Sequence, residues 1–279
     1  MKLSTLGRRD FLESMLLVGL TACAGPRAAQ RALGPGPAGG ANPFFAEMAR
    51  LSDALARGEI GGREFAYRAG ARLMELELEP DVLADWERRG PVDPGIGHNG
   101  TRILHTHDLR LPGRSAATKA ILFYTPPGVA NPPHEHHNLI SVKRVLKGHY
   151  HVRQYERVRR VEPGLVAIRQ VSEVLDVSFD GPYVDMTDDR LNVHWFGAVG
   201  AEPVLALNVV VVAPLRPADT FHGAGETRAP GQYYLDPTAA PGPDGLILAP
   251  SVGPERAEEF SRQPLAAFPS RLPSQEKSS

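Results

Sequence analysis

Two histidines spaced two residues apart are the first feature of this sequence that could do chemistry. His134 and His136 stand at the entry to an expected β-strand. Side chains two apart in a strand point to the same face, so both imidazoles can reach one metal ion. His137 then points to the opposite face, and we expect it to be a poor ligand. The spacing therefore predicts a metal site that uses His134 and His136.

The residues around this pair resemble the first sequence motif of the cupins. The positions that match the motif's intervals are Gly128, His134, His136 and Gly148. Most cupins add a glutamate ligand four or five residues after the second histidine, but Ile140 and Ser141 occupy those places here. The second cupin motif contributes one more histidine, and its best match is His194, which opens another expected strand. The resemblance thus implies a metal centre of His134, His136 and His194.

A site made of three neutral imidazoles would bring no negative charge to the metal. The ion would keep its full charge, which favours an anionic further ligand, and a thiolate is the obvious biological candidate. A mononuclear Fe(II) with three protein ligands on one side has open positions for a substrate and for dioxygen. Imidazole also suits zinc, copper and nickel, so the ligands alone leave the identity of the metal open.

A longer stretch resembles the plant cysteine oxidase and cysteamine dioxygenase family. From His134 to Tyr155 the sequence reads HEHHNLISVKRVLKGHYHVRQY, similar to the family's His-x-His block that leads into a strand. Two further blocks follow in the family's order, at 192–198 and at Tyr233-Tyr234, so the resemblance covers roughly residues 98–236. It implies one Fe(II) per chain, bound by the three histidines, and oxidation of a cysteine- or cysteamine-like thiol to a sulfinate with O2.

Two departures from this family fall near the expected substrate pocket. The family's Pro-Gly-Met after the second histidine is replaced by residues 137–139, which read His-Asn-Leu. The family's acidic residue on the strand after the third histidine is absent from residues 207–209, which read Leu-Asn-Val. Other functions therefore stay open: a metal-dependent cupin of another class, such as a non-thiol dioxygenase or an isomerase, or a non-catalytic cupin that binds a small molecule.

Further aromatic and histidine side chains are candidates for supporting roles. We predict Tyr155 and Tyr233 as catalytic residues that hydrogen-bond bound oxygen or substrate, with packing in the core as the alternative for each. The remaining histidines are expected to be structural, with a role at the metal or pocket as the alternative: His98, His105, His107, His149, His151 and His222.

The N-terminus resembles the signal of twin-arginine-exported bacterial lipoproteins. Arg8-Arg9 precedes a short apolar run from Met15 to Leu20, and small residues lead to Cys23. The run is too short to span a bilayer. The resemblance implies that residues 1–22 are removed and that a lipid on Cys23 anchors the protein on the periplasmic side of a membrane. Cys23 is the one cysteine in the sequence, so no disulfide can form within the chain.

The rest of the sequence divides into four expected regions. Residues 23–42 are rich in Gly, Ala and Pro and suit a flexible tether, and residues 43–97 have the apolar spacing of helices. From 98 to 240 the period changes to two, with Gly or Pro turns between short strands. Residues 241–279 are expected to be a tail, polar and mobile after about 250. The predicted fold class is mainly β, a cupin-type barrel (double-stranded β-helix or jelly-roll) with a small N-terminal helical segment.

Charge and hydropathy narrow the classes of partner. The formal net charge is -1 without a long basic run, which gives no electrostatic footprint for nucleic acid. The sequence contains no run of about 20 apolar residues, so we expect no helix that spans a membrane. The expected partners are a small-molecule thiol and O2, with the membrane reached only through the lipid on Cys23.

Overall fold

The computed structural model describes residues 43–76, 93–94, 99–111, 116–178, 184–186, 191–212 and 231–272. The expected export signal and tether, and residues 77–92 of the expected helical segment, lie outside the described residues. Within those ranges the chain is mainly β, with α-helices before and after the strands. None of the described helices is long and apolar enough to cross a bilayer.

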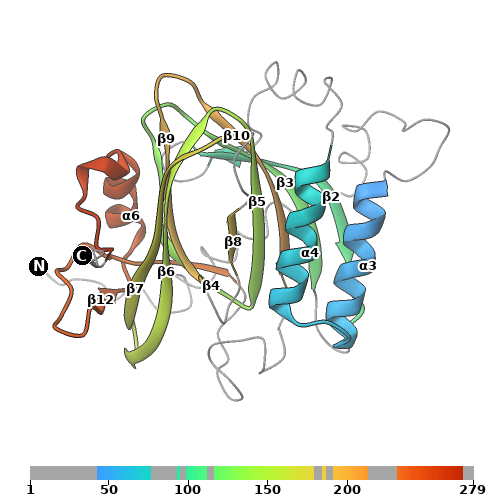
Figure 1. The fold of residues 1–279 in the computed structure, drawn as a ribbon, viewed down its shortest axis with the longest axis horizontal. Coiled ribbons are helices and arrows are strands. Elements are labelled where there is room, and N and C mark those ends of the chain that lie inside the picture. Colours follow the sequence, from blue (N-terminus) through green and yellow to red (C-terminus); the bar gives the residue numbers. More distant parts are fainter. Residues whose placement is uncertain are drawn as a thin grey trace, which may run out of the picture.

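The strands form two antiparallel sheets that face each other (Figure 1). The first has the order β1-β2-β3-β10-β5-β8, with bounds Asp93–Pro94, Gly100–Asp108, Ala117–Thr125, Val204–Val212, Leu139–Lys147 and Val184–Met186. The second has the order β11-β4-β9-β6-β7-β12, with bounds Gly231–Tyr234, Ala130–His137, Val193–Val199, His149–Glu162, Leu165–Val177 and Ile247–Pro250. From β3 to β11 the chain crosses between the sheets at nearly every step, as in a jelly-roll. The predicted cupin-type double-stranded β-helix is confirmed.

Two helices cover the outer face of the first sheet (Figure 1). They are α3 (Pro43–Arg57) and α4 (Gly62–Glu75), in the region where the sequence has helical apolar spacing. Phe65 and Leu73 of α4 belong to the same buried cluster as Val142 of β5 and Leu207 of β10. Alternate residues of β5 and β10 thus pack against the helices, which leaves their other side chains to face the second sheet.

A smaller apolar cluster fills part of the space between the two sheets. Val145 and Ala206 enter it from the first sheet, and Tyr150, Val152 and Phe196 enter it from the second. These residues define which face of each strand points into the barrel. Every second side chain along β5, β6 and β9, counted from these residues, therefore points into the same interior.

Strand β4 is irregular just before the histidines. Pro132 and Pro133 have no N–H to donate to a neighbouring strand, and the register with β9 shifts between Asn131 and His134. Such a shift is a β-bulge, which re-aims the side chains that follow it. Beyond the bulge, His134 lies directly opposite His194.

Residues 250–272 are not the mobile tail that the sequence suggested. After β12 come α6 (Pro254–Ser261) and a short 3-10 helix, η5 (Leu265–Ala267), which lie on the outer side of the second sheet (Figure 1). The rings of Phe260 and Phe268 pack on Trp195 of β9, with centroid separations of 5.3 and 4.5 Å. A few widely spaced aromatic residues fix this polar segment, and such spacing gives no periodic signal in a sequence.

Candidate metal centre

Three buried imidazoles from two neighbouring strands meet inside the barrel. His134 and His136 come from β4 and His194 from β9, and their exposed fractions are 0%, 2% and 3%. The ring centroids of His134 and His194 are 4.4 Å apart, and that of His136 lies 4.9 and 5.1 Å from them. One nitrogen from each ring lies within 4.8 Å of the others. The structure thus brings together the three residues that the resemblance implied as ligands.

The orientation of two rings suits coordination through Nε2. His134 Nδ1 lies 2.7 Å from the carbonyl oxygen of Pro132, which can only accept, so Nδ1 donates and Nε2 has the free lone pair. The Nε2 atoms of His134 and His194 are 2.8 Å apart. At this separation the lone pairs of both nitrogens could reach one ion.

Several ring nitrogens of this group lack hydrogen-bond partners. Within the described ranges, neither ring nitrogen of His136 has a partner, and nor does Nδ1 of His194. Leaving a buried polar atom unpaired costs about 1–3 kcal/mol. A cation at the point where the rings converge would remove part of that cost, so the donor set fits a metal ion such as Fe(II) or Zn(II).

The protonation state of the rings also favours metal binding. Burial lowers the pKa of His134 to about 4, despite the opposing hydrogen bond to Pro132, and the charge of Lys143 lowers it further. Burial and neighbouring positive charge also hold the pKa values of His136 and His194 well below 6.5. The three imidazoles are therefore neutral near pH 7, which is the form that binds metals.

The residues between and beside the two β4 ligands point away from the centre. Glu135 is fully buried, 2.7 Å from His137 Nε2, and accepts a hydrogen bond from Arg157 Nη1 at 2.9 Å. Burial alone would raise the pKa of Glu135, but His137 and Arg157 outweigh it and bring the value to about 2. The predicted position of His137 on the opposite face is thus confirmed. No carboxylate of the described chain joins the three histidines in their cluster.

The structure does not bring Tyr155 to the three histidines. Tyr155 lies directly opposite Val193 in the register of β6 and β9, whereas Gln154 lies opposite His194. Its side chain is buried with Trp195 and Phe260 in the cluster on the outer face of the second sheet. This placement corresponds to the core-packing alternative for Tyr155 and does not support a catalytic role.

Tyr233 also lies on the outer face, because it is paired with Glu135 on β4. Its ring contacts that of His137, with centroids 4.6 Å apart. The adjacent Tyr234 is paired with His134, and these two rings lie 6.3 Å apart. Tyr234 is thus the tyrosine of this strand on the side of the metal ligands, and burial raises the pKa of its hydroxyl.

The other described histidines have partners away from the centre. His107 joins β2 to α3 through a 3.0 Å contact of its Nε2 with Asp53. On β6, His149 contacts Asp176 at 2.6 Å and His151 contacts Glu173 at 2.7 Å. These contacts match the structural roles expected for the three residues. His98 and His222 lie outside the residues that the structure describes. His105 lies within β2, but its side chain is not described.

Sequence reasoning missed a lysine inside the barrel. Lys143 shares a face of β5 with Val145, and its Nζ lies 3.5 Å from the ring centroid of Phe196 and 4.4 Å from that of Phe123. Its charge contributes to the lowered pKa values of all three histidines. The alternation of side chains along β5 could have predicted this position. Val142 faces the helices, so the next residue, Lys143, points into the barrel.

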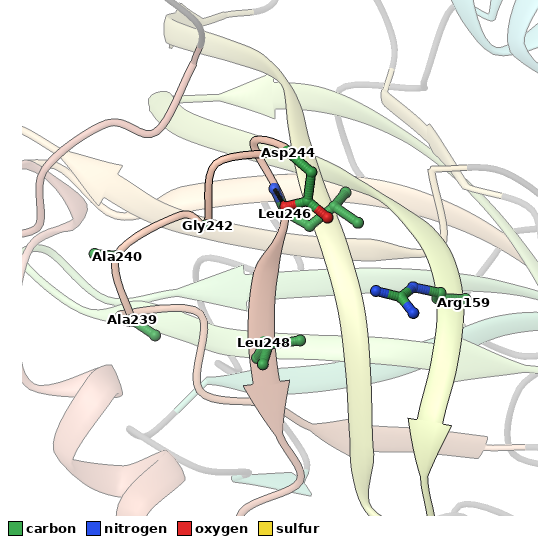
Figure 2. A pocket seen from close by; sticks show the side chains of 7 residues that line it. All are labelled: Arg159, Ala239, Ala240, Gly242, Asp244, Leu246 and Leu248. Atoms are coloured by element: carbon green, nitrogen blue, oxygen red, sulfur yellow. Dashed lines mark hydrogen bonds between the residues drawn. The ribbon is translucent and has the colours of Figure 1, made fainter.

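Figure 2 shows a surface pocket of about 310 Å³ at the far end of β6 and β12. Arg159, Leu248 and the segment before β12 line it, and none of the three histidines does. One guanidinium and one carboxylate, that of Asp244, among small and aliphatic residues offer no metal ligand set. The pocket is therefore separate from the candidate metal centre.

Comparisons with known proteins concern the fold. No protein-family model and no curated protein matches the sequence. Similar solved structures include the capsular polysaccharide assembling protein CapF from Staphylococcus aureus, with 16% identity over 47% of this chain and a TM-score of 0.27. This chain spans 31% of CapF, about a third of its length.

Two further solved structures are a double-stranded β-helix protein from Klebsiella pneumoniae and the cupin domain of Cnp3 from Schizosaccharomyces pombe. Their identities are 18% and 15%, over 43% and 38% of this chain and 81% and 58% of theirs, with TM-scores of 0.28 and 0.25. Likeness at this level carries no information on activity. The order of its own strands shows that this chain has a cupin-type fold, and the fold contains a candidate three-histidine metal centre.

Proposed function

We propose that this protein is an Fe(II)-dependent thiol dioxygenase. The reaction is R–SH + O2 → R–SO2H, in which both oxygen atoms of O2 are transferred to sulfur and the thiol is oxidised to a sulfinate. The observation that carries the proposal is the buried set of three neutral imidazoles, which no carboxylate of the described chain joins. The sequence resemblance to cysteine and cysteamine dioxygenases supports the choice of iron and of a thiol.

The charge of the site favours a thiolate over a neutral ligand. Fe(II), when bound there, supplies open coordination positions for a thiolate and for dioxygen. Three neutral imidazoles leave the charge of such an ion uncompensated, so an anion such as a thiolate is attracted to it. A carboxylate ligand would weaken that attraction.

The chain around the ligands holds them in place and keeps water away. The carbonyl oxygen of Pro132 fixes the ring of His134, and the backbone N–H of His136 donates to the carbonyl oxygen of Asn192 at 3.0 Å. The ring of Phe196 lies 4.9 Å from that of His194 and forms one wall of the site. A preorganised, apolar wall strengthens electrostatic interactions by excluding water.

Oxygen uptake by iron-loaded protein tests this proposal. Cysteine, cysteamine and 3-mercaptopropionate are offered in turn, and the product is identified by mass spectrometry. We expect uptake of O2 with at least one thiol, a sulfinate product, and loss of both in the His194→Ala variant. Absence of uptake with every thiol would overturn the proposal. Full occupancy of native protein by manganese, nickel or zinc, with turnover of a non-thiol substrate, would instead identify a different cupin enzyme.

A further inference from the structure

Lys143 is a lysine buried inside the barrel, close to the candidate metal centre. Its exposed fraction is 6%. Its Nζ lies over the ring of Phe196, and the same ring contacts His194, with 4.9 Å between the centroids. A single aromatic ring thus lies against both the lysine and one of the three proposed ligands.

No anion accompanies this lysine within the described residues. Its Nζ lies over the faces of three aromatic rings, those of Phe123, Tyr150 and Phe196. Burial lowers the pKa of Lys143 well below 10.5, and no neighbouring carboxylate counteracts that effect. A buried charge without a partner costs several kcal/mol. Two carboxylates of the second sheet have partners other than this lysine: Glu135 contacts Arg157, and Glu173 contacts Arg153.

A second polar group lies beside Lys143 on the same interior face. Asn208 of β10 is directly opposite Lys143 in the register with β5. Its amide oxygen accepts a hydrogen bond from the hydroxyl of Ser141 at 2.9 Å. The amide nitrogen of Asn208 carries two further N–H donors. This part of the interior therefore offers the amine of Lys143 and the N–H donors of the Asn208 amide.

We propose that Lys143, with Asn208 beside it, binds the carboxylate of the substrate, so that the substrate class is a short mercaptocarboxylate such as 3-mercaptopropionate or cysteine. This inference rests on the proposed thiol dioxygenase function and specifies its substrate. A mercaptocarboxylate has two anionic groups separated by a short carbon chain. The barrel offers two sites for them, the metal for the thiolate and the lysine for the carboxylate. Cysteamine would place an ammonium next to Lys143, which like-charge repulsion disfavours.

Anaerobic binding to the Fe(II)-loaded protein tests the inference without turnover. Isothermal titration compares 3-mercaptopropionate, cysteamine and uncharged 1-propanethiol. We expect the wild-type protein to bind 3-mercaptopropionate about 10- to 100-fold more tightly than 1-propanethiol, and cysteamine no more tightly than 1-propanethiol, because a charge-assisted hydrogen bond is formed only with the carboxylate. Equal affinities for the three thiols would overturn the inference.

The Lys143→Met variant keeps the length of the side chain and its aromatic contacts but removes the charge. We expect it to lose the preference for 3-mercaptopropionate and to keep its affinity for 1-propanethiol. In turnover assays, KM for 3-mercaptopropionate rises by at least about tenfold while kcat changes less. A variant that keeps the wild-type preference would contradict the inference. If Lys143→Met does not fold, the comparison of thiols on the wild-type protein decides the question alone.

The binding assay also separates this inference from the proposed function. Selective binding of 3-mercaptopropionate without O2 uptake would uphold the role of Lys143 and overturn the thiol dioxygenase activity. O2 uptake with every thiol at similar KM would uphold the activity and overturn the role of Lys143.

Discussion

At the scale of single residues, strand geometry and strand pairing decide which side chains reach the metal centre. The two-residue spacing of His134 and His136 fixes their common face, whatever the neighbouring strands do. Tyr155 and Tyr233 are on other strands, and their faces depend on the register with β9 and β4. A shift of one residue would reverse them. Register arises from long-range pairing, which the local sequence does not encode.

Removing one ligand is expected to weaken metal binding strongly. In the His194→Ala variant only two imidazoles converge, and we expect affinity for Zn(II) to fall by at least about 100-fold. The measurement is a competition titration with a chromogenic chelator. The matched control is His149→Ala, because His149 is a half-exposed β6 histidine paired with Asp176. Equal affinities of the two variants would contradict the assignment of the centre.

The pH dependence of metal binding follows from the pKa of His134. Its lowered value of about 4 means that the folded protein takes up the competing proton only near that pH, whereas an unperturbed histidine takes it up near 6.5. We expect affinity for Zn(II) to change little from about pH 7 to about pH 5 and to fall towards pH 4. The same titration repeated at each pH measures this. A decline that begins at about pH 6.5 would show that the rings titrate freely.

At the scale of elements, period-two patterning predicted most of the strands well. Strands β9 and β10, for example, lie within the region 98–240 where the period of two was expected. The full extent of β4 was missed because Pro132 and Pro133 interrupt it, and prolines are rare within strands. The structure accommodates them at a bulge, where the missing N–H groups are tolerated. That bulge, and with it the pairing of His134 with His194, could not be inferred from composition or periodicity.

The turn between β5 and β6 requires glycine for two separate reasons. Gly148 has φ +76°, and a Cβ built there would lie 2.5 Å from the carbonyl oxygen of Pro203. Gly164 has a similar φ of +80°, but a Cβ there would meet nothing within 4 Å. We expect Gly164→Ala to cost about 1–2 kcal/mol in free energy of unfolding from the backbone alone.

The Gly148→Ala variant should cost at least about 1–3 kcal/mol more, because the turn residue Pro203, just before β10, must also move. Urea unfolding of the two variants measures the difference. Equal losses would mean that the turn adapts to a Cβ and that the close approach is not required.

At the scale of the whole molecule, the two sheets have different covers and a shared interior. The helices α3 and α4 bury the outer face of the first sheet, and α6 with η5 buries that of the second (Figure 1). Because these outer faces hold much of the apolar core, the interior can hold polar groups such as the three histidines and Lys143. The sequence predicted the barrel and the N-terminal helices. It did not predict the C-terminal cover, whose few aromatic anchors form no periodic pattern.

We also propose that the protein is exported and lipid-anchored, as the N-terminal resemblance implies. Replacement of Arg8 and Arg9 by lysine should abolish twin-arginine export, since the pathway reads the arginine pair. The Cys23→Ala variant should still be exported but released from the membrane, because it lacks the residue that carries the lipid. Cell fractionation with immunodetection measures both. Membrane retention of Cys23→Ala would contradict the anchor.

The fate of isotopically heavy dioxygen tests the central claim most directly. Iron-loaded wild-type protein is mixed with 3-mercaptopropionate under heavy O2, and the product is analysed by mass spectrometry. Thiol dioxygenation at the three-histidine centre predicts a sulfinate that carries two heavy oxygen atoms, in amounts that match the O2 consumed, and no such product from the His194→Ala variant. A disulfide as the sole product, or a sulfinate with oxygen from water, would contradict it.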